Sequence, residues 1–122
     1  MGNIAGNSEQ EAVAISNSGL LKYIMMSCRD PTFSFRNEGV WVVRNLLLFL
    51  QDPLIIEKLL QQDIMAIMLE IIQKESKYVI VTLALSAINE LLAKSKTAII
   101  LFWSMGGLEK LENLKASRFS EI

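Results

Sequence analysis

The sequence predicts an all-α protein whose helices form structural repeats that stack into a solenoid. Two observations predict this fold class. The 122 residues contain no sustained alternation of apolar and polar positions and no Asn-Gly or Asp-Gly dipeptide, so strands and hairpins are not favoured. Helix-like apolar spacing recurs instead at a constant interval along the chain. With 52% hydrophobic residues, the chain can bury the core of one domain, residues 1–122.

The repeat is visible in three segments that open alike. S-G-L-L-K-Y-I, Q-D-I-M-A-I-M and G-G-L-E-K-L align on Leu20, Ile64 and Leu108, which lie 44 residues apart. A period of about 40 to 47 residues, with two or three helices in each unit, is typical of HEAT and armadillo solenoids. We therefore expect about three repeats, including partial repeats at both ends.

The elements of each repeat follow from the order of the apolar stretches. A long helix is predicted over 34–50 and another over 77–93, each after a shorter apolar segment. Pro31 and Pro53 each follow an aspartate, and Asp-Pro favours a turn or the first turn of a helix. The resulting assignment has four parts: a partial repeat over 1–6, repeat helices over 8–50, repeat helices over 52–93, and a C-terminal partial repeat over 96–116.

The helix expected to begin near residue 64 is apolar on nearly all sides. Only Glu70 interrupts the run I-M-A-I-M-L-E-I-I over 64–72. A helix without a polar face must be covered on several sides, as the middle helix of a solenoid repeat is. Ser18 and Asp63 precede two of the predicted helices and are their expected N-caps.

The composition argues against several function classes. Twelve basic and thirteen acidic residues nearly cancel, so no large charged field attracts nucleic acid or an anionic membrane. The uncharged stretch 78–88 has 11 residues, whereas a membrane helix needs about 20. The sequence has no histidine, which removes most Ser–His and Cys–His catalytic schemes and the usual zinc sites. We expect no enzyme, no cofactor or metal, and no contact with nucleic acid or membrane.

The remaining reactive groups have structural interpretations. The single cysteine, Cys28, lies in the apolar stretch I-M-M-S-C and is interpreted as a small buried hydrophobe, with a reactive thiol as the alternative. Scattered carboxylates form no convergent constellation and fit a solvated face. They include Glu70, Glu90, Glu109 and Glu112.

Residues 38–45, E-G-V-W-V-V-R-N, contain the candidate binding residues. A polar amide one turn after a tryptophan stands out in a helix of aliphatic side chains. At 100° per residue, Glu38, Trp41 and Asn45 fall within an arc of roughly 60° on one helix face. The three residue types therefore share one face, which suits recognition of a cationic peptide.

This stretch and two others resemble the armadillo repeats of importin-α, the nuclear-import adaptor. In that family the third helix of each repeat carries E-A-x-W-x-x-x-N, which residues 38–45 fit. Residues 2–7, G-N-I-A-G-N, resemble the end of another such helix, with Asn3 at the Asn position. Residues 106–112, G-G-L-E-K-L-E, resemble the last armadillo unit of the family, so the similarity covers roughly residues 2–114.

The resemblance implies an armadillo-type right-handed α-solenoid that binds proteins or peptides in nuclear import. In the family, Trp indoles form slots for the stems of Lys or Arg, and Asn amides hold the peptide backbone. A cation beside an indole contributes about 0.5–2 kcal/mol. By this resemblance Glu38, Trp41 and Asn45 bind a basic nuclear localisation signal of a cargo protein, at the secondary groove. A transport factor as a partner, and a location in cytoplasm and nucleus, are implied as well.

The sequence departs from the family pattern at several positions. In the next long helix, Leu85 or Ser86 stands where Trp is expected, and Glu90 takes the Asn position. Arg44 lies beside the Trp41–Asn45 pair, where the family has a small residue, and its charge should repel a basic ligand. The Trp partner of Asn3 and the basic importin-β-binding arm of the family are not in this sequence. One Trp–Asn pair supplies little affinity, because the family binds through repetition.

Alternative roles therefore stay open for the single residues. Trp41 belongs either to the core or to a recognition site, Asn45 is either a buried amide or a peptide ligand, and Glu38 is either a first-turn acid or part of the site. Trp103 is expected in the core or at an end contact. Core positions are expected for Met25, Met26, Met65 and Met68, and solvated loop positions for Lys94 and Lys96.

Two function classes remain. The first is an importin-α-like adaptor that binds localisation signals on its concave face. The second is a degenerate armadillo scaffold that binds a folded partner, or itself as a homo-oligomer, through apolar ends such as residues 98–105. The same apolar ends are also expected in a fragment of a longer array.

Overall fold

The computed structural model describes residues 10, 13–14, 19–75 and 77–117. These residues form seven α-helices and no strand, which confirms the all-α prediction. Ser18 and the partial repeat predicted over 1–6 lie outside the described residues. The helices are α3 (Leu20–Ser27), α4 (Phe33–Phe49), α5 (Pro53–Gln61), α6 (Ile64–Lys74), α7 (Tyr78–Lys94), α8 (Lys96–Ser104) and α9 (Gly107–Ser117).

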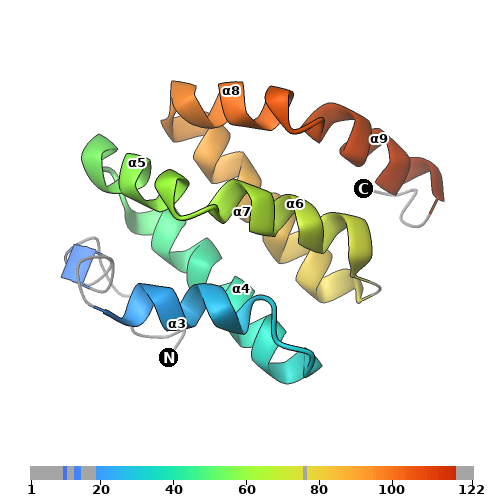
Figure 1. The fold of residues 1–122 in the computed structure, drawn as a ribbon, viewed down its shortest axis with the longest axis horizontal. Coiled ribbons are helices and arrows are strands. Elements are labelled where there is room, and N and C mark those ends of the chain that lie inside the picture. Colours follow the sequence, from blue (N-terminus) through green and yellow to red (C-terminus); the bar gives the residue numbers. More distant parts are fainter. Residues whose placement is uncertain (1–9, 11–12, 15–18, 76, 118–122) are drawn as a thin grey trace.

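The helices lie in two rows (Figure 1). α3, then α5 and α6, then α8 and α9 follow one another across the front of this view, and the long helices α4 and α7 lie behind them. The most extensive contact between two helices joins α4 to α7, and α6 also lies against α9. Each long helix packs on the helix before it, α4 on α3 and α7 on α6. Helices at equivalent places in the sequence therefore meet in space.

The core lies between the two rows and has α6 near its centre. α6 contacts α5, α7, α8 and α9, as its apolar sequence requires. Burying a Leu, Ile or Met side chain completely contributes about 1.5–3 kcal/mol, so this helix supplies a large share of the driving force for folding. Its buried residues are Ile64, Met65, Ile67, Met68, Leu69, Ile71 and Ile72.

The two long helices have the same length and an equivalent place in the chain. Each has 17 residues. The observed bounds differ by one residue from the spans predicted over 34–50 and 77–93. Their first residues, Phe33 and Tyr78, are separated by 45 positions. This alignment of the two helices is used below to compare their side chains.

Asp63 occupies the predicted N-cap position of α6 but does not cap the helix with its side chain. Its side chain makes no capping hydrogen bond and its backbone is left-handed, with φ of 65°. The chain turns from α5 into α6 within Gln62 and Asp63, and aspartate tolerates the left-handed conformation that this tight turn requires. Capping occurs elsewhere: Asp52 accepts from the N–H of Leu54 at the start of α5, and Ser95 accepts from that of Ala98 at the start of α8.

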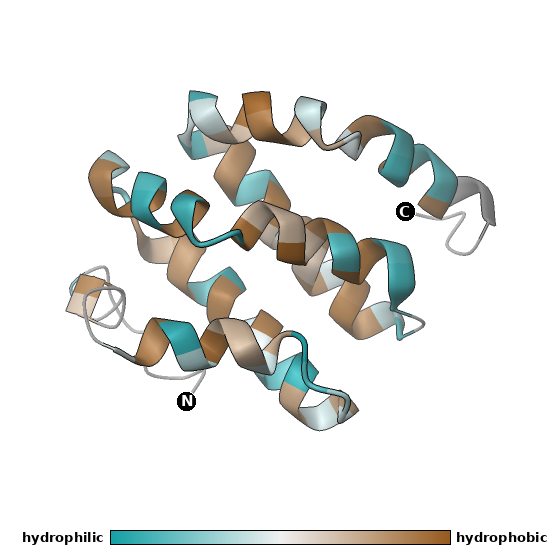
Figure 2. Ribbon diagram, in the orientation of Figure 1, coloured by the Kyte–Doolittle hydropathy of each residue, from teal (hydrophilic) through white to brown (hydrophobic). Residues whose placement is uncertain are grey.

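The positions of four further side chains differ in whole or in part from the prediction. Met26 is 60% exposed, so its predicted core position is wrong. Trp103 is 61% exposed, which contradicts the core alternative and leaves the end contact as its prediction. They belong to α3 and α8, which lie at opposite edges of the described helices (Figure 1). Figure 2 shows that apolar residues reach both of these edge helices. Lys94 belongs to α7, not to a loop, and its side chain is only 15% exposed. Lys96 is exposed as predicted, but it is the first residue of α8 and not part of a loop.

Candidate protein-interaction face on α4 and α7

The three candidate residues all lie on α4 but differ in exposure. Glu38 is exposed and Trp41 is partly buried. Asn45 is only 5% exposed, so its amide lies too deep for direct contact with a ligand in this conformation. Trp41 and Glu38 are therefore accessible members of the predicted site. The burial of Asn45 agrees with the alternative interpretation of this residue as a buried structural amide.

Arg44 connects the candidate residues to α7. Its Nη1 donates to Oδ1 of Asn45 over 3.0 Å, and its Nε donates to Oγ of Ser86 over 3.3 Å. When α4 and α7 are aligned on their first residues, Ser86 corresponds to Trp41 and Glu90 to Asn45. The guanidinium group thus extends from Asn45 on α4 to Ser86 on α7. Ser86 stands where the importin-α pattern would have its next Trp.

An unpaired acceptor lies one turn before Trp41. Oδ1 of Asn37 is buried and has no hydrogen-bond partner among the described residues. A buried polar atom without a partner costs about 1–3 kcal/mol, so such atoms are rare in native proteins. Sequence reasoning missed Asn37, because one Asn in a helix carries no signal of its burial. A donor at this position would remove the cost.

Lys94 joins the C-terminal ends of the two long helices. Its Nζ donates to the backbone carbonyls of Leu47, Leu48 and Leu50, which are left unpaired where α4 ends. The same ammonium group lies 3.3 Å from Oε2 of Glu90. Glu90, which corresponds to Asn45 in the alignment of the two helices, is therefore already paired within the chain. The four-residue spacing from Glu90 to Lys94 was a signal of this pair in the sequence.

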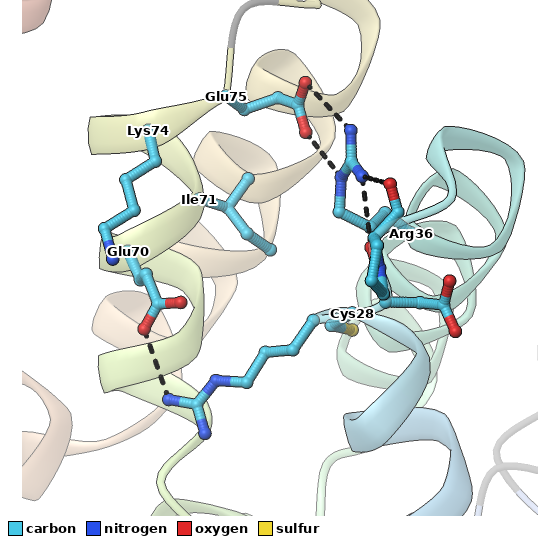
Figure 3. A pocket seen from close by; sticks show the side chains of 9 residues that line it. Cys28, Arg36, Glu70, Ile71, Lys74 and Glu75 are labelled. Atoms are coloured by element: carbon cyan, nitrogen blue, oxygen red, sulfur yellow. Dashed lines mark hydrogen bonds and ion pairs between the residues drawn. The ribbon is translucent and has the colours of Figure 1, made fainter.

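A second ion pair joins the first turn of α4 to the C-terminal end of α6 (Figure 3). Nε of Arg36 lies 2.8 Å from Oε2 of Glu75, and Nη2 lies 3.4 Å from Oε1. Nη1 donates to the carbonyls of Asp30 and Pro31 over 3.0 and 2.7 Å. Glu75 is 8% exposed. Its carboxylate is held by a bidentate guanidinium group, the strongest geometry for such a pair.

The cleft drawn in Figure 3 has a volume of about 340 Å³ and is lined by charged residues from three segments. Among the lining residues, Arg29 and Glu70 form a longer pair of 3.4 Å between the segment after α3 and α6. Cys28 also lines the cleft, but it is 1% exposed. Burial raises the pKa of its thiol to about 12, so the thiol stays protonated at neutral pH and is a poor nucleophile. The structure favours the buried-hydrophobe interpretation of Cys28.

A separate apolar groove lies between α3 and α4. It has a volume of about 220 Å³, and Glu38 is the only charged residue among those that line it. Its floor includes Gly39, where an added Cβ would lie 2.9 Å from the backbone N of Cys28. The absence of a side chain therefore allows α3 to approach α4 closely. The other lining residues are Leu20, Tyr23, Ile24, Ser27, Phe35 and Val42.

Two further observations concern metal and membrane. In the described part of the chain, His, Cys, Asp and Glu side chains form no group of three or more that could hold a metal ion. No helix of the described residues has the length and apolar character needed to cross a membrane.

Comparison with known proteins adds no relative. No protein-family model matches the chain, and no curated protein matches it either. The resemblance to importin-α therefore rests on the residues of this sequence alone, namely 2–7, 38–45 and 106–112.

Proposed function

We propose that the chain is an armadillo-type right-handed α-solenoid module, without enzymatic activity, that acts as a protein-binding adaptor. The repeated order of helices supports the solenoid arrangement. The long helices α4 and α7 begin 45 residues apart and lie against each other, and a period of about 40 to 47 residues is that of armadillo and HEAT units. The shorter helices α6 and α9 meet in the same way.

The ligand is an extended segment of a protein partner, bound on the face of α4 beside α7. The observation that carries this proposal is the combination of Glu38, Trp41 and Asn45 on one side of α4, in the pattern of the importin-α repeats. A basic localisation signal fits this set, because its cationic stems can lie beside the indole and its charges near Glu38. Nuclear import, with cargo and a transport factor as partners in cytoplasm and nucleus, is the proposed setting.

Arg44 acts against this ligand in the conformation described. Its guanidinium donates to the amide oxygen of Asn45 and so competes with a peptide N–H. Its positive charge also repels a basic segment. Binding then requires Arg44 to leave Asn45, which lowers the affinity. The buried acceptor of Asn37, one turn away from Trp41, is available for a donor of the incoming segment once the side chains rearrange.

A second candidate function is supported by the hydrogen bond from Arg44 to Asn45. If Arg44 never leaves Asn45, the chain is a degenerate armadillo scaffold that binds a folded partner or a second copy. The exposure of large apolar side chains on the edge helices supports this alternative. Tyr23 and Met26 on α3 are 64% and 60% exposed, and Ile100 and Trp103 on α8 are 67% and 61% exposed.

Titration of a fluorescent basic localisation peptide separates the two candidates. For the adaptor, the wild-type protein binds saturably, Trp41→Ala weakens binding, and Arg44→Ala strengthens it several-fold because the competing guanidinium is gone. Trp103→Ala is the matched control, since it removes the other tryptophan, which lies on α8. Binding that ignores Trp41→Ala and Arg44→Ala, or no binding at moderate salt, overturns the adaptor and leaves the scaffold.

A further inference from the structure

Arg44 differs from the other arginines of the described residues in having no counter-ion. Arg29 lies 3.4 Å from Glu70. Arg36 lies 2.8 Å from Glu75. Arg44 is partly buried, yet no carboxylate of the described residues lies within ion-pair distance of it. A charge that is withdrawn from water is normally compensated by an opposite charge, so Arg44 lacks the partner that its burial calls for.

Two neutral acceptors hold the guanidinium group of Arg44 in place. Nη1 donates to the amide oxygen of Asn45 and Nε to the hydroxyl of Ser86. Glu90, one turn after Ser86 on α7, is already paired with Lys94. Nη2 of Arg44 makes no hydrogen bond to any described residue. The guanidinium group is therefore oriented and keeps donors for a carboxylate, which can pair with it without breaking an existing ion pair.

Arg44 and Glu38 lie on opposite sides of Trp41. Three residues turn an α-helix by about 300°, so Trp41 lies about 60° around α4 from Glu38, and Arg44 lies about 60° further in the same sense. Glu38 lines the groove between α3 and α4, whereas Arg44 bonds to Ser86 of α7. A segment that crosses α4 from the side of α3 to the side of α7 therefore meets an acid, an indole and a guanidinium group in turn.

We propose that the extended segment bound beside Trp41 carries an Asp or Glu whose carboxylate pairs with Arg44, in addition to its basic residue. This inference rests on the proposed function and narrows the localisation signal to one with both charges. Arg44 then keeps its bonds to Asn45 and Ser86 and receives the carboxylate on Nη2.

The geometry of α4 sets the distance between the two charges of the segment. Arg44 lies six residues after Glu38, a rise of about 9 Å along the helix. An extended chain advances about 3.3 Å per residue. The acidic residue of the segment therefore stands at least about three positions from the basic residue.

The probes are fluorescent peptides that share one basic cluster. The basic peptide carries Gln around the cluster, and each mixed peptide carries a single Glu three, four or five residues before or after it. Anisotropy measures their binding to the full chain at moderate salt. We expect the best mixed peptide to bind about fivefold more tightly than the basic peptide. The chain has a net charge of −1, so general attraction predicts the opposite order. Mixed peptides that all bind no better than the basic peptide overturn the inference.

Variants of Arg44 decide whether the guanidinium group is the partner of the carboxylate. Arg44→Ala should bind the basic peptide more tightly than wild type and should lose the gain from Glu. Arg44→Gln keeps a polar side chain without the charge, so it gives the same test if the alanine variant does not fold by circular dichroism. Arg29→Ala removes an equal charge at a site that is 49% exposed, and should keep the wild-type order. A gain from Glu that persists without the charge of Arg44 overturns the inference.

Trp41→Ala separates this inference from the proposed function. If both hold, this variant weakens the binding of both kinds of peptide and keeps the gain from Glu. A basic peptide that binds through Trp41, with no gain from Glu, supports the adaptor and overturns the carboxylate contact. A gain from Glu that needs Arg44 but ignores Trp41→Ala supports the carboxylate contact and overturns the ligand site beside the indole. Absence of binding by every peptide overturns both.

Discussion

The ion pair between Arg36 and Glu75 is expected to be the most valuable charged interaction in the structure. Arg36→Ala removes two contacts to the Glu75 carboxylate and two hydrogen bonds to the carbonyls of Asp30 and Pro31. Breaking a fully buried pair costs about 3–5 kcal/mol, because one charge stays buried without its partner. Here the side chain of Arg36 is 23% exposed, so water screens the pair in part.

The remaining contacts of Glu75 lower the estimate further. The backbone N–H of Lys77 donates to Oε1 of Glu75 and still stabilises the carboxylate in the variant. We therefore expect Arg36→Ala to lower the free energy of unfolding by about 2 kcal/mol. Arg29→Ala is the matched control, because Arg29 forms an ion pair with Glu70 of α6. The side chains of Arg29 and Glu70 are 49% and 39% exposed. An exposed pair of this kind contributes about 0–1 kcal/mol.

Urea denaturation followed by circular dichroism measures both variants. The midpoint should fall clearly for Arg36→Ala and hardly change for Arg29→Ala, with the denaturant slope unchanged in both. Arg36→Lys keeps the charge but loses the bidentate geometry, and it should fall between them. If Arg36→Ala costs no more than Arg29→Ala, the argument from burial and geometry is wrong.

Three further predictions concern other residues. Gly39→Ala should lower the melting temperature and cost about 1–3 kcal/mol, because the new Cβ meets the backbone of α3; Gly19→Ala, with open space around it, should not, and equal melting temperatures would contradict the close approach. Cys28, whose pKa burial raises to about 12, should react with a thiol reagent only through unfolding. Its folded pKa lies above the unfolded value, so its contribution to stability is complete below about pH 8.5 and falls by about 1.4 kcal/mol per pH unit above it; Cys28→Ala should lack this loss, and an identical pH profile of unfolding would refute the assignment. Lys94→Met keeps the apolar stem but loses the bonds to the end of α4, and should cost about 1–2 kcal/mol by urea denaturation; an unchanged midpoint would show that water replaces the ammonium group.

The helices were predictable because their signals are local. Apolar residues at helical spacing and the two Asp-Pro dipeptides lie within a few residues of the elements that they specify. The long helices therefore appear within one residue of their predicted spans. Asp63 takes its predicted N-cap position without a capping bond, because the two-residue connection to α5 imposes a left-handed backbone on it, and that constraint comes from the neighbouring helix.

The candidate site was predictable only as a set of residue types on one helix face. The spacing placed Glu38, Trp41 and Asn45 on one side of α4, and the structure has all three on that helix. Their different burial depends on what packs over each of them, which helical spacing does not describe. The bond from Arg44 to Ser86 joins residues 42 positions apart, so no local pattern predicts it.

The sequence by itself determined the helical class and the spans of the two long helices, because backbone hydrogen bonds and apolar periodicity act over one or two turns. Only the tertiary structure decided that Met26 and Trp103 are exposed, that Lys94 joins two helices and that a groove lies between α3 and α4. The physical reason is the position of a helix among the helices that pack around it. An apolar stripe predicts that a helix side needs a cover, but whether a neighbour supplies it depends on segments far away in the sequence.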